Sequence, residues 1–149
     1  MARLHEYQAK AILAANGLQI PRGRAASNPD DAVIAAKELG VQVVTKIQAW
    51  TTGRAGIGGI AFAKNPEEVR DHAKRMLAMK AGQFPVEAVL IEQKIAIDRE
   101  FFLSFAIDDA ARAPVIVFAS GGALQSQDDA CAAPCFRGSG SAIIRLTAC

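Results

Sequence analysis

The chain has 149 residues, of which 51% are hydrophobic and 21% charged, the size and composition of one globular domain. Its formal net charge of +2 comes from Lys and Arg residues scattered among Asp and Glu, which argues against a nucleic-acid-binding protein. No signal-peptide core and no run of roughly 18 apolar residues is present, so we expect a cytoplasmic protein that does not span a membrane.

Hydrophobic periodicity and capping residues predict three helices in the first half of the chain. The first covers residues 5–15 and the second covers residues 28–39. The third begins at Asn65 and ends near Gly82. The last two open with Asn-Pro followed by acids, because Asn accepts bonds from free N–H groups, Pro fits the first turn and acids oppose the helix dipole.

Runs of β-branched and apolar residues predict strands between and after these helices. The predicted strands cover residues 41–47, 60–63, 86–93, 100–107 and 114–120, with a short further strand at 142–146. Residues 108–112 join two of them as a hairpin. Helices and strands thus alternate at first and then give way to a meander. This order predicts an α+β or mixed α/β fold with antiparallel pairs, and not the parallel winding of a Rossmann domain.

A glycine-rich loop joins the first two predicted strands, with four glycines among the seven residues from Gly53 to Gly59. Glycines let main-chain N–H groups converge on phosphate oxygens, and Lys46 and Arg54 add positive charge. The P-loop pattern GxxxxGK[ST] is absent, and strand residues follow the loop where a Rossmann fingerprint needs a helix. The loop therefore predicts a nucleotide phosphate site of another kind. A flexible hairpin with Lys46 as an exposed edge charge fits the spacing equally well.

Two acids, Glu92 and Glu100, flank the short crossover between the third predicted strand, residues 86–93, and the fourth, residues 100–107. Carboxylates at strand ends can accept bonds from ribose hydroxyls or help arrange a metal, and they are equally typical of solvated strand ends. Trp50 could stack on a base, but an aromatic beside a glycine loop more often anchors that loop. His5 and His72 have no acid or nucleophile at a suggestive spacing, so they predict no catalytic triad.

Five landmarks, in the same order over about residues 1–122, resemble those of the succinyl-CoA synthetase (succinate-CoA ligase) beta subunit. They are Leu4-His-Glu-Tyr-Gln-Ala-Lys10, Val43-Val-Thr-Lys46 with Gln48, the Gly53-Arg54 loop closing in Gly58-Gly59, Val89-Leu-Ile-Glu92, and Asp98-Arg-Glu100. Malate-CoA ligase and citryl-CoA synthetase are similar relatives. The resemblance implies an ATP-grasp fold, in which two α+β lobes clasp a nucleotide. It identifies residues 1–122 as the amino-terminal portion of that domain.

The resemblance also implies an activity and a set of partners. The family couples ATP or GTP, bound with Mg²⁺, to thioester formation between a carboxylic acid and coenzyme A, a step of the tricarboxylic acid cycle. A separate alpha subunit carries its phosphohistidine, so no catalytic residue is assigned here, and the metal ligands are expected in a region that this chain lacks. Carried over by position, the nucleotide-binding residues are Lys46, Gly53, Arg54, Ala55, Glu92, Ile95 and Glu100, with Ile95 acting through its backbone.

The glycine loop departs from the family's pattern. The common family loop reads like HAGGRGKAGG, whereas this chain has Trp50-Thr-Thr-Gly-Arg-Ala-Gly-Ile-Gly-Gly59, which replaces a histidine, a glycine and a lysine. This difference predicts a divergent branch with altered phosphate affinity, whose carboxylic acid need not be succinate.

Residues 123–149 change in character, since Ser, Gln, Asp, Gly, Pro and Cys mix without either period until residue 142. We interpret this segment as an atypical tail that arose by truncation or a shifted reading frame. Its three cysteines, Cys131, Cys135 and Cys149, have no metal-site or disulfide spacing and are expected to be thiols without a role.

We expect little or no ligase turnover from these residues alone, since phosphoryl transfer needs all its charge-neutralising parts together. Two alternatives remain at this point. The chain could be a noncatalytic interaction module that binds an alpha-type partner or self-associates through exposed strands. An ATP-grasp ligase that forms amides is the other, and the opening Leu4-to-Lys10 motif disfavours it.

Overall fold

The computed structural model describes residues 4–40, 42–50, 54–99, 101–110, 112–120 and 141–145. The chain divides into two compact units, Met1–Ile95 and Ala96–Cys149. Within the described residues, no helix is both long enough and apolar enough to cross a membrane. The mixture of helices with antiparallel sheets confirms the predicted α+β class.

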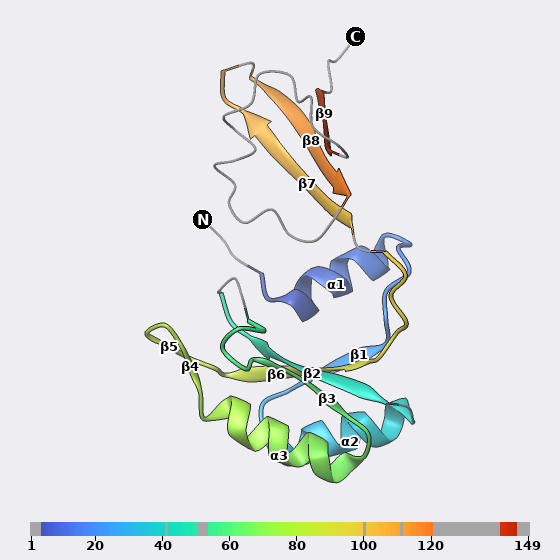
Figure 1. The fold of residues 1–149 in the computed structure, drawn as a ribbon, viewed down its shortest axis with the longest axis vertical. Helices are drawn as coiled ribbons and strands as arrows, with labels where there is room; N and C mark the ends of the chain where they lie inside the picture. Colours follow the sequence, from blue (N-terminus) through green and yellow to red (C-terminus); the bar gives the residue numbers. More distant parts are fainter. Residues whose placement is uncertain are drawn as a thin grey trace. The chain divides into compact units, whose positions relative to one another are not determined.

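A four-stranded antiparallel sheet forms the centre of the first unit (Figure 1). Its strands, in spatial order, are β1 (Gly23–Ala26), β6 (Ala88–Gln93), β2 (Val43–Gln48) and β3 (Ile60–Ala63). The helices of this unit are α1 (Glu6–Ala15), α2 (Pro29–Leu39) and α3 (Pro66–Leu77). Helices α2 and α3 cover one face of the sheet and α1 lies over the other (Figure 1). The unit therefore has three layers.

The hydrophobic core lies between the sheet and the α2–α3 layer. Alternate residues of the two central strands, Val43 and Ile47 of β2 with Val89 and Ile91 of β6, are buried there against the helices. The helices contribute mainly Ala32, Ala35, Ala36, Val69, Ala73 and Met76. Because strand side chains alternate between faces, the residues next to these core positions point toward α1. The charged side chains of β2 and β6, Lys46 and Glu92, thus lie on the α1 face.

The predicted starts of α2 and α3 are confirmed at the level of single hydrogen bonds. The Asn28 side chain accepts a bond from the backbone N–H of Asp31 at 2.8 Å, and Asn65 accepts one from Glu68 at 2.9 Å. Each Asn is followed by proline at the first helical position. Gly40 ends α2 in the left-handed conformation, with a φ of 65°.

The end of α3 was predicted wrongly. The helix stops at Leu77, and a small hairpin of β4 (Lys80–Ala81) and β5 (Phe84–Pro85) follows. Gly82, with a φ of 65°, makes the turn of that hairpin and does not stop the helix. The backbone N–H of Val86 bonds to the carbonyl of Met79 at 3.1 Å, so Val86 closes the hairpin and β6 begins only at Ala88.

Strand β1 was not predicted at all. Its sequence, Gly-Arg-Ala-Ala, contains no β-branched or aromatic residue. It is a strand because its backbone pairs with β6, from Gly23 opposite Glu92 to Ala26 opposite Val89. A Cβ at Gly23 would lie 3.0 Å from the carbonyl oxygen of Ile91, so glycine allows this close pairing.

The second unit contains a three-stranded antiparallel sheet in the order β7-β8-β9. Its strands are β7 (Phe101–Asp108), β8 (Ala113–Ser120) and β9 (Ser141–Arg145). The predicted hairpin between β7 and β8 is confirmed, and so is the short late strand, which pairs with β8. The expected division between residues 1–122, the amino-terminal portion of the domain, and the tail 123–149 falls outside the described residues and stays a prediction.

Candidate functional site

Two residues predicted to bind nucleotide lie side by side on the α1 face of the sheet. Lys46 of β2 is paired with Leu90 of β6, and Glu92 is paired with Val44, which makes Lys46 and Glu92 diagonal neighbours on one face. The Lys46 Nζ lies 2.6 Å from Glu92 Oε2. Glu92 is only 3% exposed, so its charge depends on protein partners and not on water.

Helix α1 places two further charged side chains over this pair. Glu6 and Lys10 are one turn apart, and Lys10 Nζ lies 2.9 Å from Glu6 Oε1. Lys10 also donates to Glu92 Oε1, the carboxylate oxygen that Lys46 leaves free. The Lys46 Nζ lies 3.2 Å from Glu6 Oε1, so both lysines lie between the same two acids.

Arg54 of the glycine loop completes the group, with its Nη2 2.8 Å from Glu6 Oε2. We call these five residues the charge cluster: Glu6, Lys10, Lys46, Arg54 and Glu92. Three positive and two negative charges leave the cluster with one positive charge. It is partly closed to solvent, because the side chains of Glu6, Lys10, Lys46 and Arg54 are between 19% and 26% exposed.

The mutual contacts of the cluster fix the ionisation of Glu6 and Lys10. Burial alone would raise the pKa of Glu6, but the hydrogen bond from Lys10 and the charges of Lys46, Lys10 and Arg54 together lower it from 4.5 to about 2. Burial alone would lower the pKa of Lys10, but its bonds to Glu92 and Glu6 outweigh that effect and raise the pKa. Both side chains are therefore charged at neutral pH.

The glycine loop holds Arg54 against the end of β2. Arg54 Nη1 donates to the carbonyl of Ile47 at 3.2 Å, and the carbonyl of Arg54 accepts from the N–H of Gly59 at 2.7 Å. The N–H of Ile47 in turn donates to the carbonyl of Gly59 at 2.8 Å. The N–H of Gly58 donates to the carbonyl of Ala55 at 3.0 Å. The described part of the loop is therefore a bonded turn, which counts against a merely flexible hairpin.

Gly59 has no room for a Cβ in this turn. An added Cβ would lie 2.6 Å from Ile47 Cδ1 and 2.9 Å from the carbonyl oxygen of Arg54. We expect Gly59→Ala to lower the free energy of unfolding by about 2 kcal/mol, through overpacking of a core side chain and displacement of the loop. Urea unfolding of the variant would measure it. The double variant Gly59→Ala with Ile47→Val should lose less unfolding free energy than the two single variants lose together. Strict additivity of the two losses would contradict this account.

The predicted site residues are brought together only in part. Lys46, Arg54 and Glu92 meet in the charge cluster, and Ala55 lies in the bonded turn beside Arg54. Ile95 follows the end of β6 by two residues, and its side chain is 49% exposed. Gly53 and Glu100 lie outside the described residues, and their roles stay predictions.

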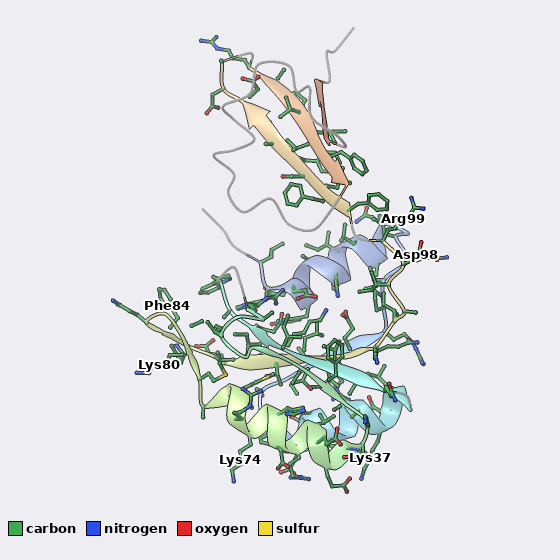
Figure 2. All side chains as sticks on the ribbon, viewed as in Figure 1. Lys37, Lys74, Lys80, Phe84, Asp98 and Arg99 are labelled. Atoms are coloured by element: carbon green, nitrogen blue, oxygen red, sulfur yellow. The ribbon has the colours of Figure 1, made fainter. Side chains whose placement is uncertain are left out.

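The aromatic residue beside the loop has a protein partner. Trp50 stacks on His5, with ring centroids 4.8 Å apart and planes inclined by 11°. The edge of Phe84, at the β4–β5 hairpin (Figure 2), lies against Trp50 at 6.5 Å between centroids. Trp50 thereby ties the start of the glycine loop to the start of α1, which supports the anchoring interpretation. His72 is elsewhere, with its Nε2 3.2 Å from the carbonyl oxygen of Phe62.

Glu6 and Lys10 were not predicted as site residues, although the signal for them was present. Glu followed by Lys four residues later places both side chains on one face of the first helix. What the sequence could not show is that this face lies on Lys46 and Glu92, which are 36 to 86 residues away along the chain.

Comparison with known proteins identifies the family for most of the chain. Residues 3–134 match the family model described as an ATP-grasp domain. Over 132 residues the chain is 39% identical to the succinate–CoA ligase [ADP-forming] subunit beta of Methanothermobacter thermautotrophicus, a match that covers 89% of this chain and 36% of that protein. The subunit of the same name from Geobacter sulfurreducens is 39% identical over 127 residues, covering 80% and 33%. The chain thus spans about a third of the length of these curated relatives.

A solved structure shows the same fold. The acetyl-coenzyme A synthetase 1 of Ca. Korarchaeum cryptofilum, in complex with coenzyme A, has a TM-score of 0.70 at 23% identity, covering 80% of this chain and 54% of that one. The sequence matches confirm the resemblance to succinate–CoA ligase beta subunits, and the family model accounts for most of the residues. The chain belongs to the ATP-grasp domain family.

Proposed function

We propose that this chain is the nucleotide-binding part of an acyl-CoA ligase, which couples ATP or GTP to thioester formation between a carboxylic acid and coenzyme A. The observation that carries the proposal is the charge cluster. Lys46 of β2 and Arg54 of the glycine loop, two positions expected to contact phosphate, converge there with Lys10 of α1 in a chain of the ATP-grasp family.

The chemistry of the cluster fits a phosphate anion. Lys46 Nζ and the Arg54 guanidinium supply charged donors that are partly closed to water, where hydrogen bonds to phosphate oxygens are strong. The N–H groups from Gly53 to Ala55 would add uncharged donors. The cluster does not fit a metal ion, because both of its carboxylates are already bound to cations.

Glu92, Ile95 and Glu100 would hold the base and the ribose. Both oxygens of Glu92 accept bonds from lysines, but each carboxylate oxygen can accept a further bond from a hydroxyl or amino group. Glu92 would therefore serve two purposes, by positioning Lys46 and by contacting the nucleoside. Ile95 would offer its backbone groups beyond the end of β6.

The remaining components of the reaction would act from outside the described site. Mg²⁺ would arrive with the nucleotide and neutralise charge on its phosphates. Coenzyme A and a phosphohistidine-bearing alpha subunit complete the family chemistry. Because the 149 residues span about a third of the length of the curated relatives, we expect little or no turnover from them alone.

Titration calorimetry with Mg-ATP and Mg-ADP tests this proposal. We expect binding by the wild-type chain, and at least about tenfold weaker binding by Lys46→Ala, since the variant loses a charged contact to phosphate. The matched control is Lys74→Ala, because Lys74 points away from the sheet on the outer side of α3, the layer opposite the cluster (Figure 2). Failure of the wild type to bind either nucleotide, or equal binding by the two lysine variants, would contradict the proposal.

A noncatalytic interaction module is the second candidate, and one observation favours it. Alternate residues of β7 put large apolar side chains on one face of that strand, each more than half exposed: Phe101, Leu103, Phe105 and Ile107. Such a stripe is typical of a surface that another chain or lobe covers. A stable oligomer together with no nucleotide binding in the same titration samples would favour this second function.

A further inference from the structure

Glu6 lies where an anion would be expected to bind. Its Oε1 is 2.9 Å from Lys10 Nζ and 3.2 Å from Lys46 Nζ, and its Oε2 is 2.8 Å from Arg54 Nη2. One carboxylate is thus held by three cations from three separate elements. A phosphate group, which also presents several anionic oxygens, would use the same donors.

The charge balance of the cluster points the same way. With Glu6 ionised, Glu6 and Glu92 offset two of the three positive charges. If Glu6 moved away, two positive charges would remain uncompensated in a partly closed site, and an incoming phosphate could offset both. If the phosphate enters as Glu6 leaves, the cluster never carries those two uncompensated positive charges, and their cost is avoided.

We propose that Glu6 is an internal placeholder for the nucleotide's phosphate, occupying an anion subsite formed by Lys10, Lys46 and Arg54 until phosphate replaces it. The identity of the anion rests on the proposed function. The inference adds Lys10 to the phosphate-binding residues. It makes Glu6 a competitor of phosphate for the same cations.

The exchange needs only a side-chain movement. The start of α1 is held separately, because the backbone N–H of Tyr7 bonds to the Gln48 side-chain oxygen of β2 at 3.3 Å and His5 stacks on Trp50. The glutamate side chain can therefore rotate out of the cluster about its own torsions while the helix stays in place.

The competing account is that Glu6 only positions Lys46 and Arg54. The two accounts predict opposite signs. Removing a competitor strengthens phosphate binding, whereas removing a positioning group weakens it. Glu6→Gln separates them, because the amide keeps the size of the side chain and removes its charge.

The experiment is calorimetric titration of the full chain with inorganic tripolyphosphate and, separately, with Mg-ATP. We expect Glu6→Gln to bind tripolyphosphate about tenfold more tightly than the wild type, and Lys10→Met to bind it several-fold more weakly. The matched control is Glu38→Gln, which removes the same charge from an exposed α2 residue paired with Arg24 and should change neither affinity. Equal or weaker tripolyphosphate binding by Glu6→Gln would overturn the placeholder, and unchanged binding by Lys10→Met would overturn the part given to Lys10.

Two further arms keep the test decisive. Should Glu6→Gln fail to fold, Glu6→Asp retains the charge but is one methylene too short to reach all three cations, so it should bind tripolyphosphate more tightly than wild type by a smaller factor. Failure of Glu6→Asp to bind tripolyphosphate more tightly than the wild type would overturn the proposal.

The Mg-ATP titration separates this proposal from the proposed function. Mg-ATP binding by the wild type without tighter binding in either Glu6 variant would defeat the placeholder alone. Tightened tripolyphosphate binding in a chain that does not bind Mg-ATP would instead support the placeholder and defeat the proposed function.

Discussion

Replacing Glu92 by Gln is expected to lower the free energy of unfolding by about 3 kcal/mol at neutral pH. Glu92 is buried on the α1 face of the sheet, near the end of β6, and its two oxygens each accept a bond from a lysine. The amide keeps the shape but removes the charge, so Lys10 and Lys46 would have only Glu6 as a counterion. One amide group would also be directed at a lysine that cannot accept its hydrogens.

Urea unfolding followed by far-UV circular dichroism measures this loss. The control is again Glu38→Gln, which breaks an exposed pair with Arg24 at 3.1 Å and should change stability by less than about 1 kcal/mol. A loss for Glu92→Gln no larger than that of the control would show that the cluster contributes little to folding. A second variant, Glu92→Gln with Lys10→Met, should recover part of the loss, because it removes one of the two unpaired cations.

The features that were predictable from the sequence are those fixed by local chemistry. The side chains of Asn28 and Asn65 each accept a bond from the backbone N–H three residues later, so both helix starts could be predicted from local sequence alone. The glycine loop could be recognised because its composition has few uses other than tight turning or close approach to a ligand.

The features that were missed depend on pairing between distant segments. Residues 78–80 are good helix formers, and nothing in their sequence ends α3 at Leu77. The helix stops because Lys80 pairs with Pro85 and Met79 accepts a bond from Val86. Strand β1 has the same origin, since only β6 makes its four residues extended.

The site residues also divide into those that could be predicted from the sequence and those that could not. Lys46 and Glu92 could be named from strand ends and from the family resemblance, but their direct contact follows from the β2–β6 register. Glu6 and Lys10 join them only because α1 lies on that face of the sheet. The sequence therefore pointed to Lys46 and Arg54, the cations that we propose to bind phosphate, and did not predict that Glu6 pairs with them.

Acid should unfold this protein partly through Glu6. The pKa of Glu6 is about 2 in the folded chain, against an ordinary value of 4.5, so the folded state holds the ionised form more strongly than the unfolded state does. By linkage, the resulting stability is fully present above about pH 4.5 and is lost as the pH falls toward 2. A shift of this size corresponds to about 3 kcal/mol of stability at neutral pH.

The difference in stability between wild type and Glu6→Gln isolates this contribution, because the other carboxylates titrate in both proteins. We expect urea unfolding to give a difference of about 3 kcal/mol at pH 6 that shrinks steadily below pH 4.5 and nearly vanishes near pH 2. The raised pKa of Lys10 acts at the other end of the scale, where its stabilisation is lost only as the pH rises past its ordinary value of 10.5. A difference that stays constant from pH 6 to pH 2.5 would mean that Glu6 ionises as an ordinary exposed glutamate does. The three cations would then not hold it, and neither the cluster's stability nor the placeholder exchange could rest on its charge.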